Sequence, residues 1–149
     1  MTSSQSTAEV AALLDAYLIS LDDEILDAGW AKGLFTDDAV IEFPNARHQG
    51  ADGLPAFHQK SLDAFARHQH LGSPAVVALE GEDRATLRAN VIATHVHHLP
   101  ATAPEGTPAP RFAAGTFVNG AARRTPEGWR LSSLSFRVVW TEGNPPGAN

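Results

Sequence analysis

The chain has 149 residues, with 11 basic and 17 acidic side chains, a formal net charge of −6 and no cysteine. This length fits a single domain over 1–149, and the missing cysteines exclude a disulfide scaffold, a thiolate metal site and a cysteine nucleophile. The acidic balance disfavours nucleic acid as a partner, and with no membrane-length apolar run and no visible secretory signal, we expect a cytoplasmic protein without a membrane partner.

The first half of the chain is expected to be helical. Apolar residues recur three and four positions apart from Val10 to Leu21, as they do on an amphipathic helix. The predicted elements of this half are helices over 10–21, 25–35 and 54–66 and a short strand over 40–43. Residues 1–6 and 143–149 are polar or rich in glycine and proline, and we expect disordered tails there.

The second half is expected to be strands. They are predicted over 71–80, 84–97, 111–124 and 129–140, with turns at 81–83 and 125–128. Four prolines within 99–110 predict a long loop of the kind that often borders a site. Helices followed by long antiparallel strands indicate an α+β fold, with the helices on the concave face of a curved, mostly antiparallel sheet that encloses a pocket.

Five of the seven histidines lie in two clusters, at 68–70 and 95–98. In the predicted strand over 84–97 the odd-numbered positions are mostly apolar, so this face should point to the interior and carry His95 and His97 with it. Three alanines on the same face leave room for a pocket beside His95. His97 and His98 are expected at the pocket mouth or in solvent.

His70 shares this face with His95 for two of the possible lengths of the turn at Gly81. A two-residue turn puts His70 opposite Ala93, and a four-residue turn puts it opposite His95. A three-residue turn would break the arrangement, because a slip of one residue moves one set of side chains to the other face. His68 has the same parity as His70, so four imidazoles could gather at one mouth of the pocket.

An acidic residue on the first helix is expected to complete the site. Asp22 lies four residues after Leu18 and so continues the apolar stripe. A carboxylate on the buried side of a helix is costly unless a group in the interior receives it, and an imidazole in the pocket would do so. Asp23 is the competing candidate, although its position favours exposure. The remaining histidines, His48 and His58, are expected on the surface.

Several short motifs together resemble a known family, and the resemblance covers residues 8–142. They are Tyr17…Asp22, Trp30…Leu34-Phe35, Asp38-Ala39-Val40, His68-Gln69-His70-Leu71-Gly72, Thr94-His95 and Gly128-Trp129…Trp140. They look like the SnoaL-like branch of the nuclear transport factor 2-like (NTF2-like) superfamily, and within it like scytalone dehydratase and the bile-acid 7α-dehydratases. The resemblance implies a cone-shaped α+β barrel with catalytic positions at Asp22, His70 and His95, and a helper position at Tyr17.

The resemblance also implies which residues line the pocket. Tyr17 is the only tyrosine, so the second pocket tyrosine of scytalone dehydratase has no counterpart, and Asn119 stands beside the position where the family has a polar pocket residue. The predicted substrate-binding residues are Trp30, Phe43, Val91, Phe112, Thr116, Val118, Asn119 and Phe136. Paired His-x-His motifs could supply nitrogen ligands to a metal, but the family is cofactor-free, so we predict no metal and no cofactor.

The predicted function is therefore general acid–base catalysis on a small apolar, oxygenated molecule, such as a polyketide- or steroid-like compound. A dehydratase is the most specific form, with His95 and Asp22 as the base and His70 as the group that protonates or positions the leaving oxygen. An isomerase or polyketide-type cyclase would use the same residues, and a non-catalytic binding protein is the alternative of a different class. Apolar residues on both faces of the strand over 129–140 also suggest a homodimer.

Overall fold

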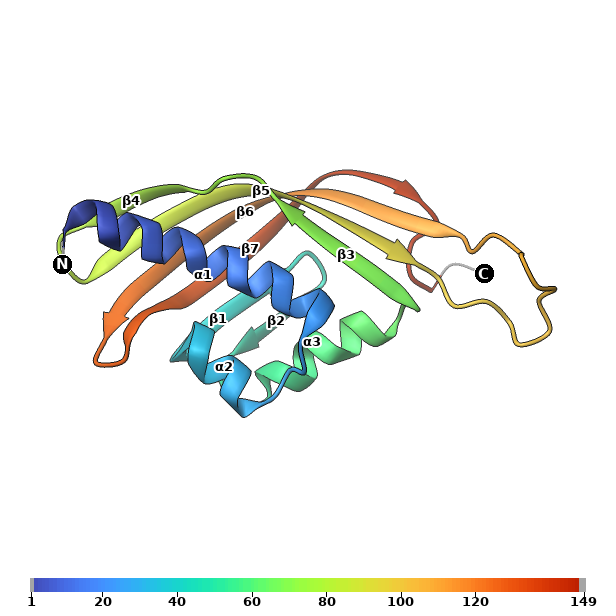
Figure 1. The fold of residues 1–149 in the computed structure, drawn as a ribbon, viewed down its shortest axis with the longest axis horizontal. Helices are drawn as coiled ribbons and strands as arrows, with labels where there is room; N and C mark the ends of the chain where they lie inside the picture. Colours follow the sequence, from blue (N-terminus) through green and yellow to red (C-terminus); the bar gives the residue numbers. More distant parts are fainter. Residues whose placement is uncertain (1, 148–149) are drawn as a thin grey trace.

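The computed structural model describes residues 2–147, and this part of the chain forms three helices and one curved sheet of seven strands (Figure 1). The helices are α1 (Ser3–Asp23), α2 (Ala28–Leu34) and α3 (Leu54–Asp63). The strands are β1 (Phe35–Phe43), β2 (Ala46–Gln49), β3 (Arg67–Gly72), β4 (Val76–Glu80), β5 (Arg84–Val96), β6 (Arg111–Thr125) and β7 (Gly128–Gly143). The α+β class and the mostly antiparallel sheet are as the sequence predicts.

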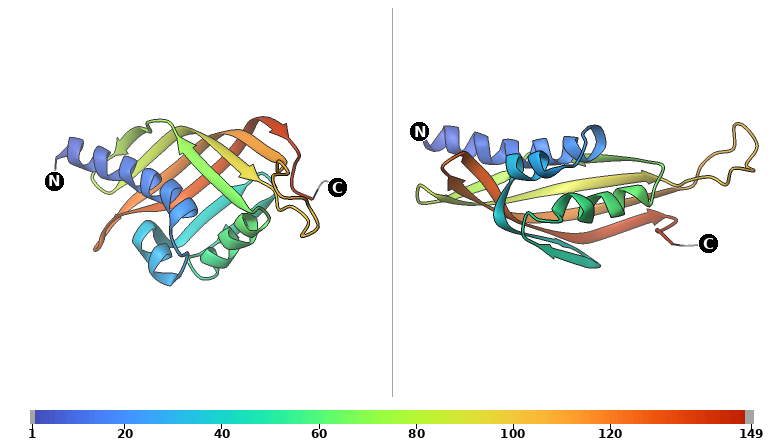
Figure 2. Two further views of the ribbon diagram at one scale, coloured as in Figure 1. Left: turned by 45° about the vertical axis from the view of Figure 1, so that its right-hand side comes forward. Right: turned by 90° about the horizontal axis from the view of Figure 1, so that it is seen from below.

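The sheet has the order β2-β1-β7-β6-β5-β3, and β4 also pairs with β5. The pairing of β1 with β7 is parallel, and the other pairings are antiparallel. Helix α1 contacts β3, β4, β5 and β7, and Figure 2 shows it lying along one face of the bent sheet. The core therefore lies between α1 and the sheet. No helix in residues 2–147 is long and apolar enough to cross a membrane.

Helix α1 begins earlier than the sequence pattern predicts. The Thr2 side chain accepts a hydrogen bond from the Gln5 backbone N–H, and the Gln5 side chain accepts one from the Thr2 backbone N–H. This capping box satisfies two backbone donors that would otherwise be unpaired. Ser6 is also buried. The expected disordered tail at 1–6 is therefore wrong for residues 2–6, because polar residues can cap a helix as well as leave it unformed.

The turn between β4 and β5 has three residues. By itself, a turn of this length would place His70 and His95 on opposite faces of the sheet. Glu80 pairs with Arg84, so residues 81–83 form the turn. However, the sequence pattern treats 71–80 as one strand, whereas the structure breaks it into β3 and β4. Between the pairs Val76–Arg88 and Gly72–Val91, three residues of one strand face two of β5. This bulge shifts the register by one residue and cancels the effect of the turn.

The bulge at 73–75 is held by hydrogen bonds to β5. The Ser73 backbone N–H donates to the Asn90 carbonyl, and the Asn90 N–H donates to the Ser73 hydroxyl. Pro74 at the centre has no N–H that would need a ladder partner. As a result, His70 lies opposite Ala93 and His68 lies opposite His95. His70 and His95 therefore share a face of the sheet, as predicted. The three-residue turn and the bulge together produce this arrangement, and not a turn of two or four residues.

Other elements differ from the predicted ones at their ends. Strand β2 follows a turn at Pro44 and Asn45. The sequence pattern predicts the strand before this turn but no strand after it. Strand β7 extends to Gly143, where the second tail was expected to start, and residues 148 and 149 lie outside the described range. The proline-rich segment between β5 and β6 is irregular as predicted, but it projects away from the body of the molecule (Figure 1).

Candidate active site

A cavity of about 750 Å³ lies between α1, α3 and the strands of the sheet. Its walls are largely apolar, and none of the described residues that line it is an aspartate or glutamate. Three of the four predicted catalytic residues, Tyr17, His70 and His95, line it directly. A space of this size is in the range of pockets that hold small-molecule ligands.

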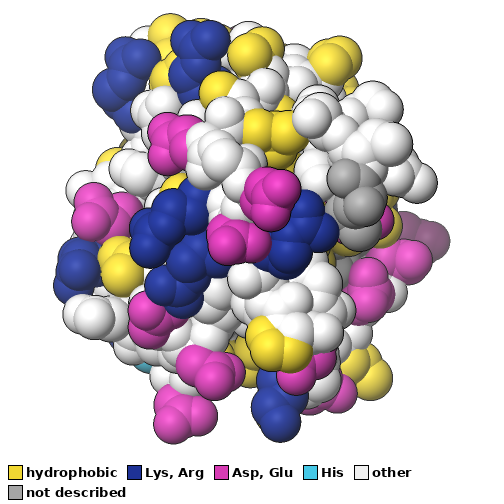
Figure 3. Space-filling view, turned by 90° about the vertical axis from the view of Figure 1, so that its left-hand side faces the viewer, with side chains coloured by type: hydrophobic (Ala, Val, Ile, Leu, Met, Phe, Trp, Pro, Cys, Tyr) yellow, Lys and Arg dark blue, Asp and Glu magenta, His cyan; other side chains and the backbone are white. Residues whose placement is uncertain are grey.

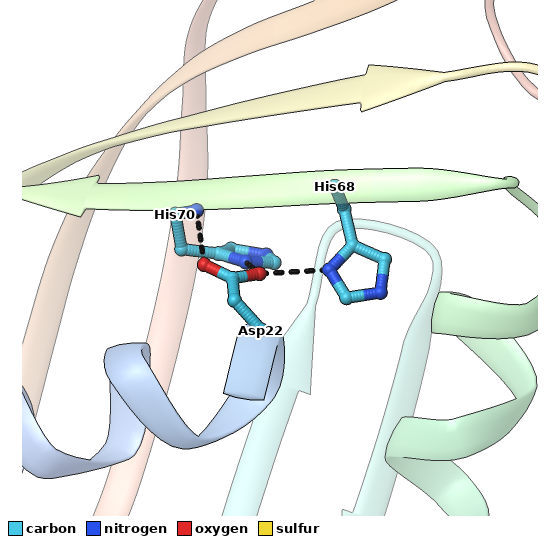
Figure 4. A group of neighbouring side chains, drawn as sticks. All are labelled: Asp22, His68 and His70. Carbon is cyan, nitrogen blue, oxygen red and sulfur yellow. Dashed lines mark hydrogen bonds and ion pairs between the residues drawn. The ribbon is translucent and has the colours of Figure 1, made fainter. Parts of the chain in front are cut away.

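Asp22 lies outside the cavity lining, at the end of α1, where it meets two histidines of β3 (Figure 4). The Asp22 Oδ1 atom is 2.7 Å from His68 Nδ1 and 2.8 Å from His70 Nδ1. The Asp22 Oδ2 atom accepts a hydrogen bond of 2.7 Å from the His70 backbone N–H. Asp22, and not the exposed Asp23, is therefore the acid of the first helix that reaches the histidines.

The surroundings of Asp22 favour its charged form. Partial burial raises the pKa of the carboxyl. The hydrogen bonds from His68, from the His70 backbone and from the His70 ring together lower it by more, so the pKa is below its usual value. Because a carboxylate can only accept hydrogen bonds, both rings donate through Nδ1–H. This leaves Nε2 as the unprotonated nitrogen of each neutral imidazole.

His70 is the histidine that connects this cluster to the cavity. Burial lowers the pKa of the His70 ring, while the hydrogen bond and the charge of Asp22 partly restore it. The ring lines the cavity and its Nδ1 atom is occupied by Asp22, so Nε2 is the nitrogen available to a bound molecule. Such an imidazole can accept a proton, and the neighbouring carboxylate then stabilises the cation that forms.

His95 is not paired with Asp22, contrary to the predicted arrangement. Its Nδ1–H donates to the Phe112 carbonyl oxygen over 3.0 Å, because His95 is on β5 and faces the neighbouring strand β6. The His95 and His70 rings are perpendicular, with centroids 6.1 Å apart. Burial lowers the pKa of His95, and the hydrogen bond to Phe112 opposes this. His70 and His95 thus border the same space, but of these two only His70 is bonded to the acid.

Tyr17 is paired with a histidine that the sequence pattern placed on the surface. The Tyr17 hydroxyl lies 2.8 Å from His58 Nε2, and His58 Nδ1–H donates to the Leu54 carbonyl. Burial lowers the pKa of His58 to about 4, so the ring is neutral and its Nε2 accepts the Tyr17 proton. Burial also raises the pKa of the Tyr17 hydroxyl. The hydroxyl of Tyr17 is therefore already committed to a protein partner.

The surface assignment of His58 is wrong, since only 2% of the residue is exposed. A signal for it was present in the sequence: Leu54, His58 and Leu62 are spaced four apart, and all three are buried on one face of α3. Phe57, the residue before His58, also fits an apolar face of α3. A pattern that counts Phe57 as the buried residue leaves the polar His58 on the surface.

The predicted substrate-binding residues divide into two groups. Those that line the cavity are Phe43, Val91, Phe112, Thr116 and Phe136. Those that do not line it are Trp30, Val118 and Asn119. Trp30 is buried and donates its ring N–H to Ser20, Val118 is fully buried in the core, and Asn119 is exposed because its odd position on β6 faces away from the interior. The Thr116 hydroxyl donates to the Val91 carbonyl.

A second, smaller cleft lies at the opposite end of the sheet. It has a volume of about 550 Å³ and is lined by both acidic and basic side chains, among them Lys32, Asp38 and Arg123. Arg123 forms an ion pair with Asp38, and Arg130 donates to the Lys32 carbonyl. Figure 3 shows dark blue and magenta side chains interleaved over this end of the molecule. The apolar cavity is the better candidate site, because it brings together three of the four predicted catalytic residues.

Comparison with known proteins agrees with this architecture. The SnoaL-like domain family matches residues 2–135. The Kfla4162 protein from Kribbella flavida has a similar structure, with a TM-score of 0.79, 28% identity and 95% of each chain covered. An NTF2-like superfamily protein from Salmonella enterica has a TM-score of 0.75 at 17% identity, covering 92% of this chain and 93% of that one.

A candidate scytalone dehydratase from Novosphingobium aromaticivorans also has a TM-score of 0.75, at 18% identity, with 99% of this chain and 95% of that chain covered. At this identity the likeness concerns the fold alone. None of the curated proteins matches the chain significantly. The family match covers most of the described residues, and the fold is the one that the sequence motifs imply. The chain therefore belongs to the SnoaL-like domain family.

Proposed function

We propose that the protein is a cofactor-independent enzyme that performs general acid–base chemistry on an apolar, oxygenated small molecule. One observation carries this proposal: His70 borders a largely apolar cavity while its other ring nitrogen is bonded to the Asp22 carboxylate. A carboxylate that fixes the tautomer of an imidazole and stabilises its cation is a common arrangement for a general base. The apolar walls favour a substrate with an apolar ring system.

The proposed reaction is a dehydration. His70 Nε2 takes a proton from a carbon next to a carbonyl group of the substrate, and the electron pair expels a hydroxyl group from the neighbouring carbon. The protonated His70 then returns the proton to the departing oxygen, and water leaves. Asp22 stabilises the imidazolium between the two steps. This assignment gives His70 the role of base that the sequence suggested for His95, because Asp22 contacts His70 and not His95.

His95 is proposed to orient the substrate. Its Nδ1–H is held by the Phe112 carbonyl, so Nε2 of the neutral ring accepts a hydrogen bond from a substrate hydroxyl. Its ring lies within reach of the same bound molecule as His70, with 6.1 Å between the centroids. Tyr17 has a structural role in this scheme, since its hydroxyl donates to His58. The cavity carries no acidic side chain among its described lining residues, which suits a neutral or anionic substrate.

An isomerase or cyclase would share the first step, the removal of a proton by His70, and differ only in the fate of the electron pair. The dehydratase is preferred because a structural neighbour is named for scytalone dehydration, although that likeness extends only to the fold. A ligand carrier would need no carboxylate behind a cavity histidine. The Asp22–His70 contact therefore favours catalysis over simple binding.

The test uses two-ring cyclic β-hydroxy ketones as substrates, with mass spectrometry of the products formed in deuterated water. A dehydratase gives products lighter by one water, whereas an isomerase gives deuterium exchange without that loss. We expect His70→Gln to lower the rate by about 10²-fold or more. His98→Gln is the matched control, because His98 is an exposed histidine outside the cavity lining. Retention of the rate within a few-fold in folded His70→Gln would refute the role of His70.

A further inference from the structure

We infer that Asp22, His68 and His70 form a binding site for one first-row transition-metal ion, such as Zn²⁺, and that occupation of this site turns off His70 as a base. The second part of this inference rests on the proposed function, and the first part does not. Two imidazoles and one carboxylate are a donor set that such ions prefer, whereas Mg²⁺ and Ca²⁺ prefer oxygen atoms alone.

The distances between the donor atoms are close to those that a metal requires. One ligand atom from each residue can be chosen so that all lie within 4.8 Å of one another. In a tetrahedral zinc site, bonds of about 2.0–2.2 Å place neighbouring ligand atoms about 3.3 Å apart. The Asp22 Oδ1 atom lies 2.7 and 2.8 Å from the two Nδ1 atoms, so these two distances need to lengthen by only about half an ångström to admit an ion.

The three side chains are also held in place by the fold. His68 and His70 are two residues apart on β3, so their side chains lie on the same face of a strand that pairs along its length with β5. The Asp22 Oδ2 atom is anchored by the His70 backbone N–H, which leaves Oδ1 facing both rings (Figure 4). An anchored carboxylate of this kind resembles the outer-shell hydrogen bonds that orient ligands in metal sites.

The cluster is accessible to an ion from solvent. The side chains of Asp22, His68 and His70 are 19, 18 and 11% exposed. Three protein ligands leave at least one coordination position for water. The site is therefore neither sealed in the core nor spread over a flexible surface.

A metal at this site would change which nitrogen of His70 carries the proton. In the structure, both Nδ1 atoms donate to Asp22, so Nε2 of each neutral ring is free to accept. Coordination needs the lone pair of Nδ1, and the single proton of a neutral imidazole then resides on Nε2. The nitrogen of His70 that is available to the cavity would become a donor. Metal binding and base catalysis by His70 are thus mutually exclusive.

Two measurements on the full-length protein test the site without any substrate. Isothermal titration with zinc sulfate in a non-coordinating buffer should give one Zn²⁺ per chain for the wild type and no binding of magnesium. His68→Gln should weaken zinc binding by at least about tenfold, and the exposed histidine variant His98→Gln should leave it unchanged. Nitrogen-15 NMR of the histidine side chains should show the protons of His68 and His70 on Nδ1 without metal and on Nε2 with zinc.

Equal zinc affinity in the wild type and His68→Gln, or absence of binding to the wild type, would overturn the inference. So would a loss of affinity in His98→Gln, because the ion would then be held by surface histidines. The variant His68→Gln keeps the contact between Asp22 and His70, so the turnover that remains in it should resist zinc, while zinc inhibits the wild type. Zinc binding without turnover of any substrate would refute the proposed function and leave the metal site intact.

Discussion

The Asp22 carboxylate at the end of α1 accepts a hydrogen bond from the His70 backbone N–H in the middle of β3, with 2.7 Å between the two atoms. The same carboxylate accepts hydrogen bonds from two side chains of that strand. These contacts fix the end of the helix against the sheet at the edge of the cavity. The position of the proposed base therefore depends on the packing of α1 on β3.

Replacing Asp22 by asparagine should impair catalysis more than folding. The amide oxygen can still accept hydrogen bonds from Nδ1–H, and the NH2 group that replaces Oδ2 cannot accept from the His70 backbone N–H, which costs some stability. The larger effect is on catalysis, because the amide carries no charge to stabilise the His70 imidazolium. We expect kcat to fall by about 10²-fold or more with little change in KM. Asp23→Asn is the matched control, since Asp23 is the adjacent, exposed acid. Steady-state kinetics and thermal melts of both variants provide the comparison, and equal losses in the two would contradict the role of Asp22.

Gly72 offers a way to disturb the contact between α1 and β3 without touching the site. A Cβ atom at Gly72 would lie 2.7 Å from Leu18 Cδ1, so alanine there must push the helix and the strand apart or move Leu18. We expect Gly72→Ala to destabilise the protein by about 1–3 kcal/mol. Urea unfolding measures this effect, and a reduced kcat in the folded fraction would show that the helix had moved Asp22.

The control for this substitution is Gly33→Ala, within α2. A Cβ atom at Gly33 meets nothing within 4 Å, and the backbone is helical. Alanine there should leave stability unchanged or raise it by about 0.4–1 kcal/mol, because it restricts the unfolded chain. A similar loss of stability in both variants would mean that the close approach of Gly72 to Leu18 is not the cause.

The helices and the long strands could be predicted from the sequence, because each depends on a local period of apolar residues. The pairing of Asp22 could not. The prediction chose the acid of α1 that contacts the histidines but gave it His95 as its partner. The choice between His70 and His95 depends on how far α1 extends along β3, and no local pattern encodes that length.

The register of the histidines shows how two local features can cancel. The sequence indicated a turn near Gly81 but not its length, and it gave no sign that the strand would break at Pro74 and reform in a new register. A three-residue turn alone would turn His70 away from His95. Only the pairings Glu80–Arg84 and His70–Ala93 together show that the bulge compensates for the turn. Bulges of this kind are set by tertiary packing as much as by composition.

The homodimer remains a prediction, and β7 is where it can be tested. Val139 and Trp140 are 60 and 43% exposed, and neither lines the cavity. If this surface meets a second copy, Val139→Glu should convert a dimer to a monomer by burying a charge at the interface. Light scattering coupled to size exclusion measures the mass. Ile25→Glu is the control, since Ile25 is 84% exposed and lies far from β7 in the sequence. A wild-type monomer at high protein concentration would refute the prediction.

The buried pair of Tyr17 and His58 should make the protein sensitive to mild acid. The pKa of His58 falls from its usual 6.5 to about 4 in the folded protein, so the unfolded chain binds more protons between these values. The stability that depends on neutral His58 is therefore fully present above pH 6.5 and is lost as the pH falls towards 4. The loss should reach on the order of 3 kcal/mol, and below that pH the lowered pKa of Asp22 adds a separate acid sensitivity.

Urea unfolding between pH 4 and pH 7 tests this pH dependence. The double variant Tyr17→Phe/His58→Phe removes the titrating ring together with the hydroxyl that donates to it, so no buried hydroxyl is left without a partner. We expect its free energy of unfolding to vary less with pH over this interval than that of the wild type. His70 and His95, whose pKa values are also lowered, should retain part of the slope in both proteins. An identical slope in the double variant would show that His58 does not carry the acid sensitivity.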